Sequence, residues 1–245
     1  MNRGSWDKFR KTKNNFRNLI HELDQELPNL QNIQQKFVDS RGGNAVYKVE
    51  TPIVYNTALD DITTDSEIKL ILVADNPGRR EQAAENKKYL VGPSGKIAAK
   101  FFRETMGIDF YKNVIILNKT PIHSPRTIEL KDLCKLGGEP VASALEKSQK
   151  VMADLLYKFH EALAVPVYII GYSEMKKGGL FETYTEELKR LYADKPEMYK
   201  ELFIYRHFSM NQFTIDLKKQ ALPNEPKAKS LKRIGTGYRQ RILGF

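Results

Sequence analysis

The sequence contains a single cysteine, Cys134, among 245 residues. One thiol excludes an internal disulfide, and it also excludes zinc or iron–sulfur sites built from several cysteines. No apolar run reaches the roughly 18 residues that a membrane-spanning helix needs, and no apolar stretch typical of a secretory signal follows the charged first residues. We therefore expect an intracellular, cytoplasmic protein with no membrane partner and no cofactor.

Acidic residues are fewer than basic ones, with 30 Asp and Glu against 40 Lys and Arg, which gives a formal charge of +10. The basic residues are concentrated at the two ends of the chain. Residues 1–20 contain one acidic side chain, Asp7, and residues 227–245 contain none. A basic chain with basic ends is typical of proteins that bind a polyanion, most often nucleic acid, although ends that only aid solubility give the same pattern.

Four short apolar runs alternate with amphipathic patterns in the centre of the chain. The apolar runs cover residues 69–74, 113–117, 165–170 and 202–205. The helical patterns between them cover residues 94–106, 141–163 and 182–192. Because β-branched runs that alternate with helices form parallel sheets, the sequence predicts an α/β protein. We expect a three-layer αβα fold around a mostly parallel, four-stranded sheet.

The same patterns divide the chain into three parts. Residues 1–43 are expected to form a basic helical arm, with apolar residues at helical spacing over 7–27 and a second helix over 30–38. Residues 44–226 are expected to form the α/β domain. Residues 227–245 are expected to be a basic tail, because glycines interrupt this last segment. We expect the protein to act as a monomer.

Polar residues follow directly after three of the predicted strands. Asp75 and Asn76 follow the first run, Asn118 follows the second and His207 lies just past the fourth. The carboxyl ends of parallel strands open on one edge of the sheet, where ligands bind, so these side chains are expected to meet in one crevice. The sequence thus predicts a site that contains an acid, two amides and an imidazole.

The segments that carry these residues resemble motifs of the uracil-DNA glycosylase superfamily. The turn after the first strand, Ala74-Asp75-Asn76-Pro77-Gly78, is similar to the G-x-N-P-G and G-E-A-P-G turns of that family, and Glu81 follows it as an acidic residue does in the thermostable branch. Residues 89–95, Tyr-Leu-Val-Gly-Pro-Ser-Gly, resemble the P-F-V-G-x-A-G segment that opens a helix in this branch.

Two further motifs match at later strand ends. Residues 118–121, Asn-Lys-Thr-Pro, resemble the motif in which a strand ends in Asn before a Pro-containing loop, and residues 207–209 resemble H-P-S. In all, the resemblance spans about residues 68–215. The chain lacks the four cysteines of the thermostable branch, Leu90 replaces the base-stacking Phe, and Phe208 replaces the Pro. It therefore looks like a divergent member without an iron–sulfur cluster.

The resemblance implies a DNA base-excision glycosylase, which hydrolyses the N-glycosidic bond of uracil or a related damaged base. Cleavage passes through an oxocarbenium-like sugar and a base anion, so the chemistry needs an oriented water and a hydrogen-bond donor. Asn76 is expected to hold the water, Asp75 to polarise it or to stabilise the cation, and His207 to donate to the uracil O2.

Asn118 is expected to read the base, because an amide can pair with both O4 and N3–H of uracil whereas cytosine presents the opposite pattern. The other residues expected to bind the substrate are Pro77, Gly78, Tyr89 and Leu90. The target nucleotide must leave the base stack, and an apolar wedge assists this step. The residues expected to contact DNA, with the wedge among the last four, are Gly92, Ser94, Gly95, Lys119, Arg126, Phe208, Ser209, Met210 and Asn211.

Two other functions fit the same residues. A nucleic-acid-binding member of the same fold without catalysis would bind DNA and release no base. A hydrolase of small nucleotides or nucleosides would use the same crevice, would ignore polymeric DNA and would not need the basic ends. The leading prediction is a DNA repair glycosylase that acts on single-stranded or double-stranded DNA.

Overall fold

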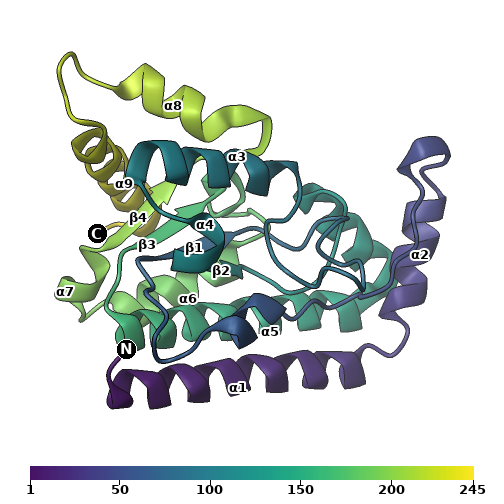
Figure 1. The fold of residues 1–245 in the computed structure, drawn as a ribbon. Coiled ribbons are helices and arrows are strands. Elements are labelled where there is room, and N and C mark those ends of the chain that lie inside the picture. Colours follow the sequence, from purple (N-terminus) through teal and green to yellow (C-terminus); the bar gives the residue numbers. More distant parts are fainter.

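A four-stranded, all-parallel sheet lies at the centre of the protein, with strand order β2-β1-β3-β4 (Figure 1). The computed structural model describes the backbone of residues 1–245 and every side chain except that of Asn44. The strands are β1 (Leu70–Ala74), β2 (Val114–Asn118), β3 (Val167–Ile170) and β4 (Leu202–Tyr205). Every residue in them is buried, as expected for a parallel sheet that is covered on both faces.

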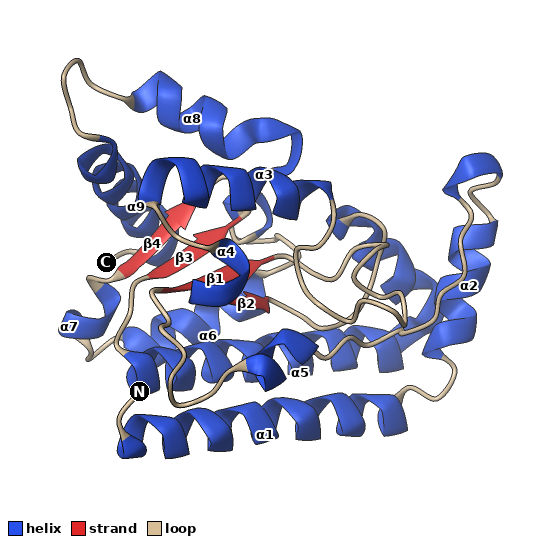
Figure 2. Cartoon of the chain, viewed as in Figure 1, coloured by secondary structure: helices blue, strands red, loops and turns tan.

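Helices cover both faces of the sheet (Figure 2). One face carries α3 (Pro93–Phe101), α8 (Gln212–Gln220) and α9 (Lys227–Leu243), and the other carries α5 (Leu130–Leu163) and α6 (Glu182–Tyr192). The remaining helices are α1 (Arg3–Glu26), α2 (Leu30–Asp39), α4 (Phe110–Asn113) and α7 (Pro196–Tyr199). The predicted three-layer αβα fold with a parallel four-stranded sheet is confirmed.

Short 3₁₀ or π turns connect these elements. They are η1 (Gly43–Ala45), η2 (Thr57–Asp61), η3 (Phe102–Met106), η4 (Thr127–Glu129), η5 (Tyr172–Glu174) and η6 (Ser209–Asn211). Within the described chain, no helix combines the length and the apolar character of a transmembrane span.

The N-terminal segment predicted as an arm packs onto the α/β domain. Helix α1 runs along α5 as an additional layer (Figure 2). Its apolar side chains Phe9 and Phe16 are fully buried, and the rings of Phe9 and Phe159 lie 5.3 Å apart between centroids. The apolar residues whose spacing predicts the helix thus lie on the face that α1 buries, and the charged residues lie on its outer side.

The C-terminal segment 227–245, predicted as a tail, is instead the helix α9, which packs against β4. The Tyr205 hydroxyl donates to the Leu231 carbonyl at 3.0 Å. A Cβ at Gly235 would lie 2.6 Å from Tyr205, so this glycine allows close packing and does not mark a turn. Arg239 is buried and donates to backbone carbonyls, among them that of Tyr199 at 2.8 Å. The prediction of a basic tail is wrong because apolar and buried polar contacts hold this segment.

Helix α5 begins at Leu130, well before the predicted start at residue 141. Gly138 has a φ of 65° and a ψ of −158°, which breaks the helical geometry, and Pro140 follows. The break interrupts the apolar spacing, and for this reason the sequence pattern shows only the second part of the helix. The first part of α5 follows directly after the turn η4.

Candidate functional site

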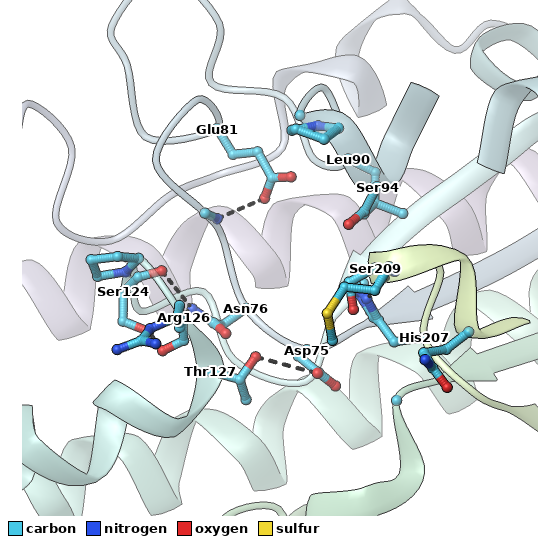
Figure 3. A pocket seen from close by; sticks show the side chains of 18 of the residues that line it. Asp75, Asn76, Glu81, Leu90, Ser94, Ser124, Arg126, Thr127, His207 and Ser209 are labelled. Atoms are coloured by element: carbon cyan, nitrogen blue, oxygen red, sulfur yellow. Dashed lines mark hydrogen bonds between the residues drawn. The ribbon is translucent and has the colours of Figure 1, made fainter. Parts of the chain in front are cut away.

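A cavity of about 740 Å³ opens at the carboxyl ends of the strands (Figure 3). Its lining comes from the segments that follow β1, β3 and β4, together with the start of α3 and the loop before η4. This is the edge at which parallel α/β sheets bind ligands. Three of the residues predicted to meet there, Asp75, Asn76 and His207, all line this cavity, and we refer to them as the floor.

Asp75 is held by a buried cation. Its Oδ1 accepts a hydrogen bond from Nζ of Lys119 at 2.6 Å, and its Oδ2 accepts one from the Thr127 hydroxyl at 3.3 Å. Lys119 is completely buried and also donates to the Ile170 carbonyl at 2.7 Å. Burial lowers the pKa of Lys119, whereas the charge of Asp75 opposes that shift. The prediction that Lys119 contacts DNA is wrong, because its charge points into the protein and fixes Asp75.

Gly171, directly after β3, is needed for this arrangement. Its φ is 82°, and a Cβ at this position would lie 2.5 Å from Oδ1 of Asp75. Any larger residue would displace the carboxylate from Lys119. The sequence shows a glycine at a strand end, but only the packing shows that Asp75 requires it.

Asn76 is oriented by the loop that precedes η4. Its Nδ2 donates to the Ser124 hydroxyl at 2.9 Å, to the Ser124 carbonyl at 3.2 Å and to the Pro77 carbonyl at 3.2 Å. All three bonds use Nδ2, and within the described chain none uses Oδ1. The amide oxygen is therefore available to accept a hydrogen bond from a molecule in the cavity.

A buried histidine supports the turn at Pro77. The Pro77 carbonyl accepts from Nδ1 of His123 at 2.8 Å, and Nε2 of His123 lies 2.7 Å from the Tyr47 hydroxyl. Burial lowers the pKa of His123 to about 4, so the ring is neutral. Because a carbonyl can only accept, Nδ1 carries the proton and Tyr47 donates to Nε2. Pro77 itself is buried and does not line the cavity, which differs from its predicted contact with substrate.

Glu81 reaches the cavity from the opposite side to Asp75 (Figure 3). Its side chain is buried, with 7% of the residue exposed, and Oε2 accepts from the backbone N–H of Gly78 at 2.9 Å. Burial raises the pKa of Glu81 to about 7, and hydrogen bonding to the backbone of Gly78 and Leu90 opposes this rise. In the sequence Glu81 only marks a motif, and nothing there shows that it is buried. Gly78, which the sequence predicts to bind the substrate, lines the cavity.

Leu90 lines the cavity in a strained backbone conformation, with a φ of 52°. A Cβ at Gly95 would lie 1.4 Å from the Leu90 carbonyl oxygen, so Gly95 permits the close approach of the two segments. The neighbouring Tyr89 is buried, and its hydroxyl donates to the Val54 carbonyl at 2.6 Å. Tyr89 and Gly95 therefore serve packing, which differs from the predicted contacts with the base and with DNA.

The N-terminus of α3 borders the cavity with two predicted DNA-binding residues, Gly92 and Ser94. Gly92 is the N-cap of this nine-residue helix, and Pro93 occupies the first turn. The first N–H groups of a helix have no partner within the helix, and the helix dipole favours negative charge beside them.

His207 is a neutral hydrogen-bond donor. Its Nδ1 accepts from the backbone N–H of Ser209 at 3.0 Å, so the proton of the neutral ring lies on Nε2. Burial lowers the pKa of His207, the charge of Asp75 opposes this shift and that of Lys119 adds to it. The floor therefore combines an ion-paired carboxylate, a free amide oxygen and a neutral imidazole.

In the segment after His207, one apolar residue is buried and another is exposed. Phe208 is buried and stacks on Phe213 with 4.3 Å between ring centroids, so the prediction that Phe208 contacts DNA is wrong. Met210 lines the cavity with 81% of its surface exposed, and Ser209 lines it as well. Met210 and Asn211 have φ values of 49° and 56°, a costly conformation that turns Met210 away from the core. Asn211 is exposed beside the cavity and does not line it.

Asn118 does not line the cavity, although it lies close behind the lining. In the parallel register it pairs with Ala74, so its side chain projects from the same face of the sheet as that of Ala74, which does line the cavity. Asn118 is buried, and within the described chain neither of its amide atoms has a hydrogen-bond partner. A buried polar group without a partner costs about 1–3 kcal/mol, so a molecule that paired with both amide atoms of Asn118 would recover this free energy.

Positive charge gathers around the opening of the cavity. The exposed residues that we call the mouth are Arg79, Arg80, Arg126, Arg206 and Met210. Arg126 pairs with Glu129 at 2.6 Å, and Arg206 lies 3.3 Å from Asp216. Only Arg126 and Met210 were expected from the sequence. The signal for Arg79, Arg80 and Arg206 was their position directly beside the motif residues Gly78, Glu81 and His207, respectively.

The described residues contain no group of three or more His, Cys, Asp and Glu side chains arranged to hold a metal ion. The arrangement can orient a water, stabilise a cation and donate a hydrogen bond to an anion. No protein-family model matches this chain, and no curated protein matches it either.

Proposed function

We propose that this protein is a DNA glycosylase that hydrolyses the N-glycosidic bond of uracil or a related damaged base. The observation that carries the proposal is the meeting of Asp75, Asn76 and His207 on the floor of one cavity. These side chains come from the ends of two strands that are far apart in the sequence. Together they offer the three functions that this reaction needs.

In the proposed reaction the C1′–N bond breaks, its electron pair stays with the base, and the oxygen of a water adds to C1′. Oδ1 of Asn76 accepts a hydrogen bond from this water and orients it. Asp75 lies beside the developing sugar cation and accepts the proton that the water loses. Nε2–H of His207 donates to an oxygen of the leaving base, where negative charge develops.

Asn118 supports uracil as the base, in a pose that reaches past the cavity lining to its buried amide. Its amide has both a donor and an acceptor without partners, and the uracil edge offers the complementary acceptor O4 and donor N3–H. Cytosine presents the reverse pattern and would leave these buried groups unpaired, which is the condition for strong discrimination.

The mouth supports a polymeric substrate. Four exposed arginines lie around the opening, where phosphates of the backbone would pass, and Arg126 and Arg206 would exchange Glu129 and Asp216 for phosphate. The exposed Met210 provides an apolar group that can enter the base stack beside an extruded nucleotide. A free nucleoside would have no use for these groups. We propose DNA as the partner, bound by a monomer.

The test is an alkaline nicking assay on oligonucleotides that each contain one uracil, hypoxanthine, xanthine or mismatched thymine, as single strands and as duplexes. We expect base release from at least one of them. The variant Asn76→Ala should lower the rate by about 10²-fold or more while DNA binding persists. The matched control is Asn18→Ala, because Asn18 is exposed on α1, and its rate should equal that of the wild type.

Other outcomes identify the alternatives. DNA binding without base release from any oligonucleotide would favour a non-catalytic binding protein. Release of uracil from free deoxyuridine but not from DNA would favour a nucleoside hydrolase. A wild-type rate for Asn76→Ala would show that the turn after β1 has only a structural role.

A further inference from the structure

The cavity contains two carboxyl groups in different surroundings. Asp75 is paired with the buried ammonium of Lys119, whereas Glu81 accepts hydrogen bonds from the backbone N–H groups of Gly78 and Leu90. The two side chains border the cavity from opposite sides (Figure 3). When two acids in one site are treated so differently by their surroundings, they are suited to different roles, one as the anion and one as the acid.

Burial keeps a large fraction of Glu81 protonated near neutral pH, because it raises the pKa of this carboxyl to about 7. Two tyrosines near it, Tyr89 and Tyr111, are themselves affected by its charge, which contributes to raising their pKa values. The other charged or titratable groups that line the cavity are Asp75, Arg79, Arg80, Arg126, Tyr172, Arg206 and His207.

Resting on the proposed function, we infer that Glu81 is a further catalytic residue that donates a proton to the leaving base. The inference extends the substrate class to bases that leave poorly as anions, above all a deaminated purine such as hypoxanthine. His207 can stabilise an anionic pyrimidine through one hydrogen bond, but a purine departs readily only when a ring nitrogen gains a proton. Glu81 is the acid in the cavity that can supply it.

The step consumes only water. Glu81 transfers its carboxyl proton to a ring nitrogen of the base while the C1′–N bond breaks and its electron pair stays with the base. Water adds its oxygen to C1′ and loses a proton to Asp75, which passes it to solvent. Solvent then returns a proton to Glu81.

The test compares Glu81→Gln with the wild type in single-turnover assays on one oligonucleotide that carries 5-fluorouracil, uracil or hypoxanthine. Gln has nearly the same size but no carboxyl proton. We expect the loss to grow as the base becomes a poorer leaving group, from less than about 3-fold for 5-fluorouracil to about 10²-fold or more for hypoxanthine. Glu85→Gln is the matched control, because Glu85 is exposed on the same loop and does not line the cavity.

A second measurement uses the wild type alone and does not depend on how well the variant folds. The rate on hypoxanthine should fall as the pH rises through about 7, the pKa of Glu81, because the proton is lost, and the rate on 5-fluorouracil should change far less. A damaged fold in Glu81→Gln would lower all three rates by one factor.

Three results would overturn the inference. Equal losses on all three bases together with parallel pH profiles would leave Glu81 without a role as an acid. Release of uracil but not of hypoxanthine by the wild type would remove the extended substrate class, and the proposed function would stand in both cases. Release of no base at all would overturn the inference and the proposed function together.

Discussion

The floor of the cavity and its mouth are built from different kinds of contact. On the floor, Asp75 and Asn76 are fixed by hydrogen bonds to the buried side chains of Lys119 and Ser124, and His207 is fixed by the backbone N–H of Ser209. At the mouth, Arg80 and Met210 are exposed. Fixed groups suit chemistry, because a reacting bond must meet them in one geometry, whereas long exposed cations suit a flexible polyanion. Variants of the two regions are therefore expected to lose function in different ways.

The largest effect on stability should come from Lys119, the buried cation that pairs with Asp75. Lys119→Met removes the partner of Asp75, and breaking a buried ion pair costs about 3–5 kcal/mol because a charge remains without compensation. We expect the free energy of unfolding in urea to fall by this amount. The double variant Asp75→Asn with Lys119→Met should recover much of the stability and none of the base release. Unchanged stability in Lys119→Met would mean that the pair contributes nothing to the fold.

A large effect on base specificity is expected from a substitution of Asn118, which lies behind the cavity lining. Asn118→Asp removes the donor that would pair with uracil O4 and introduces a charge that is costly to bury. Uracil release should fall by at least about 10²-fold, and circular dichroism should show a retained fold. Asn18→Asp on α1 is the control for a new charge on the surface. Undiminished uracil release by Asn118→Asp would exclude Asn118 from base recognition.

The smallest effect should come from the mouth. Arg80→Ala should weaken DNA binding similarly for all sequences, and should reduce the slope of log affinity against log salt by about 1, because one phosphate contact is lost. Arg10→Ala, an exposed arginine on α1, should leave the slope unchanged. If both variants reduced the slope equally, the DNA surface would not be confined to the mouth.

The fold followed from the sequence because its strands are short, apolar and separated by clear helical patterns. All four predicted runs overlap observed strands, and the edge of the sheet at which Asp75 and His207 lie follows from parallel topology alone. Both ends of the chain were harder to predict. Their basic residues dominate the sequence pattern. Their apolar faces are buried by packing against α5 and β4, and the sequence does not show that packing.

The detail of the site depended on which way neighbouring side chains point. Asn118 and Lys119 are adjacent in sequence and both buried, but only Lys119 donates a hydrogen bond to Asp75. Phe208 enters the core and Met210 leaves it, because the backbone becomes left-handed at Met210. Glu81 is buried and accepts hydrogen bonds from the backbone of Gly78, before it in the chain, and of Leu90, after it. A sequence pattern identifies positions beside a strand end, but orientation and burial are decided by contacts between distant segments.

The raised pKa of Glu81 also makes the free energy of unfolding depend on pH. Its ordinary value is 4.5, and in the folded protein it is about 7, so the native state binds this proton more tightly than the unfolded chain does. The resulting stabilisation is complete below about pH 4.5 and is lost as the pH rises through about 7, and it amounts to about 3 kcal/mol. At neutral and higher pH the protein is therefore less stable than it would be with an uncharged side chain at this position.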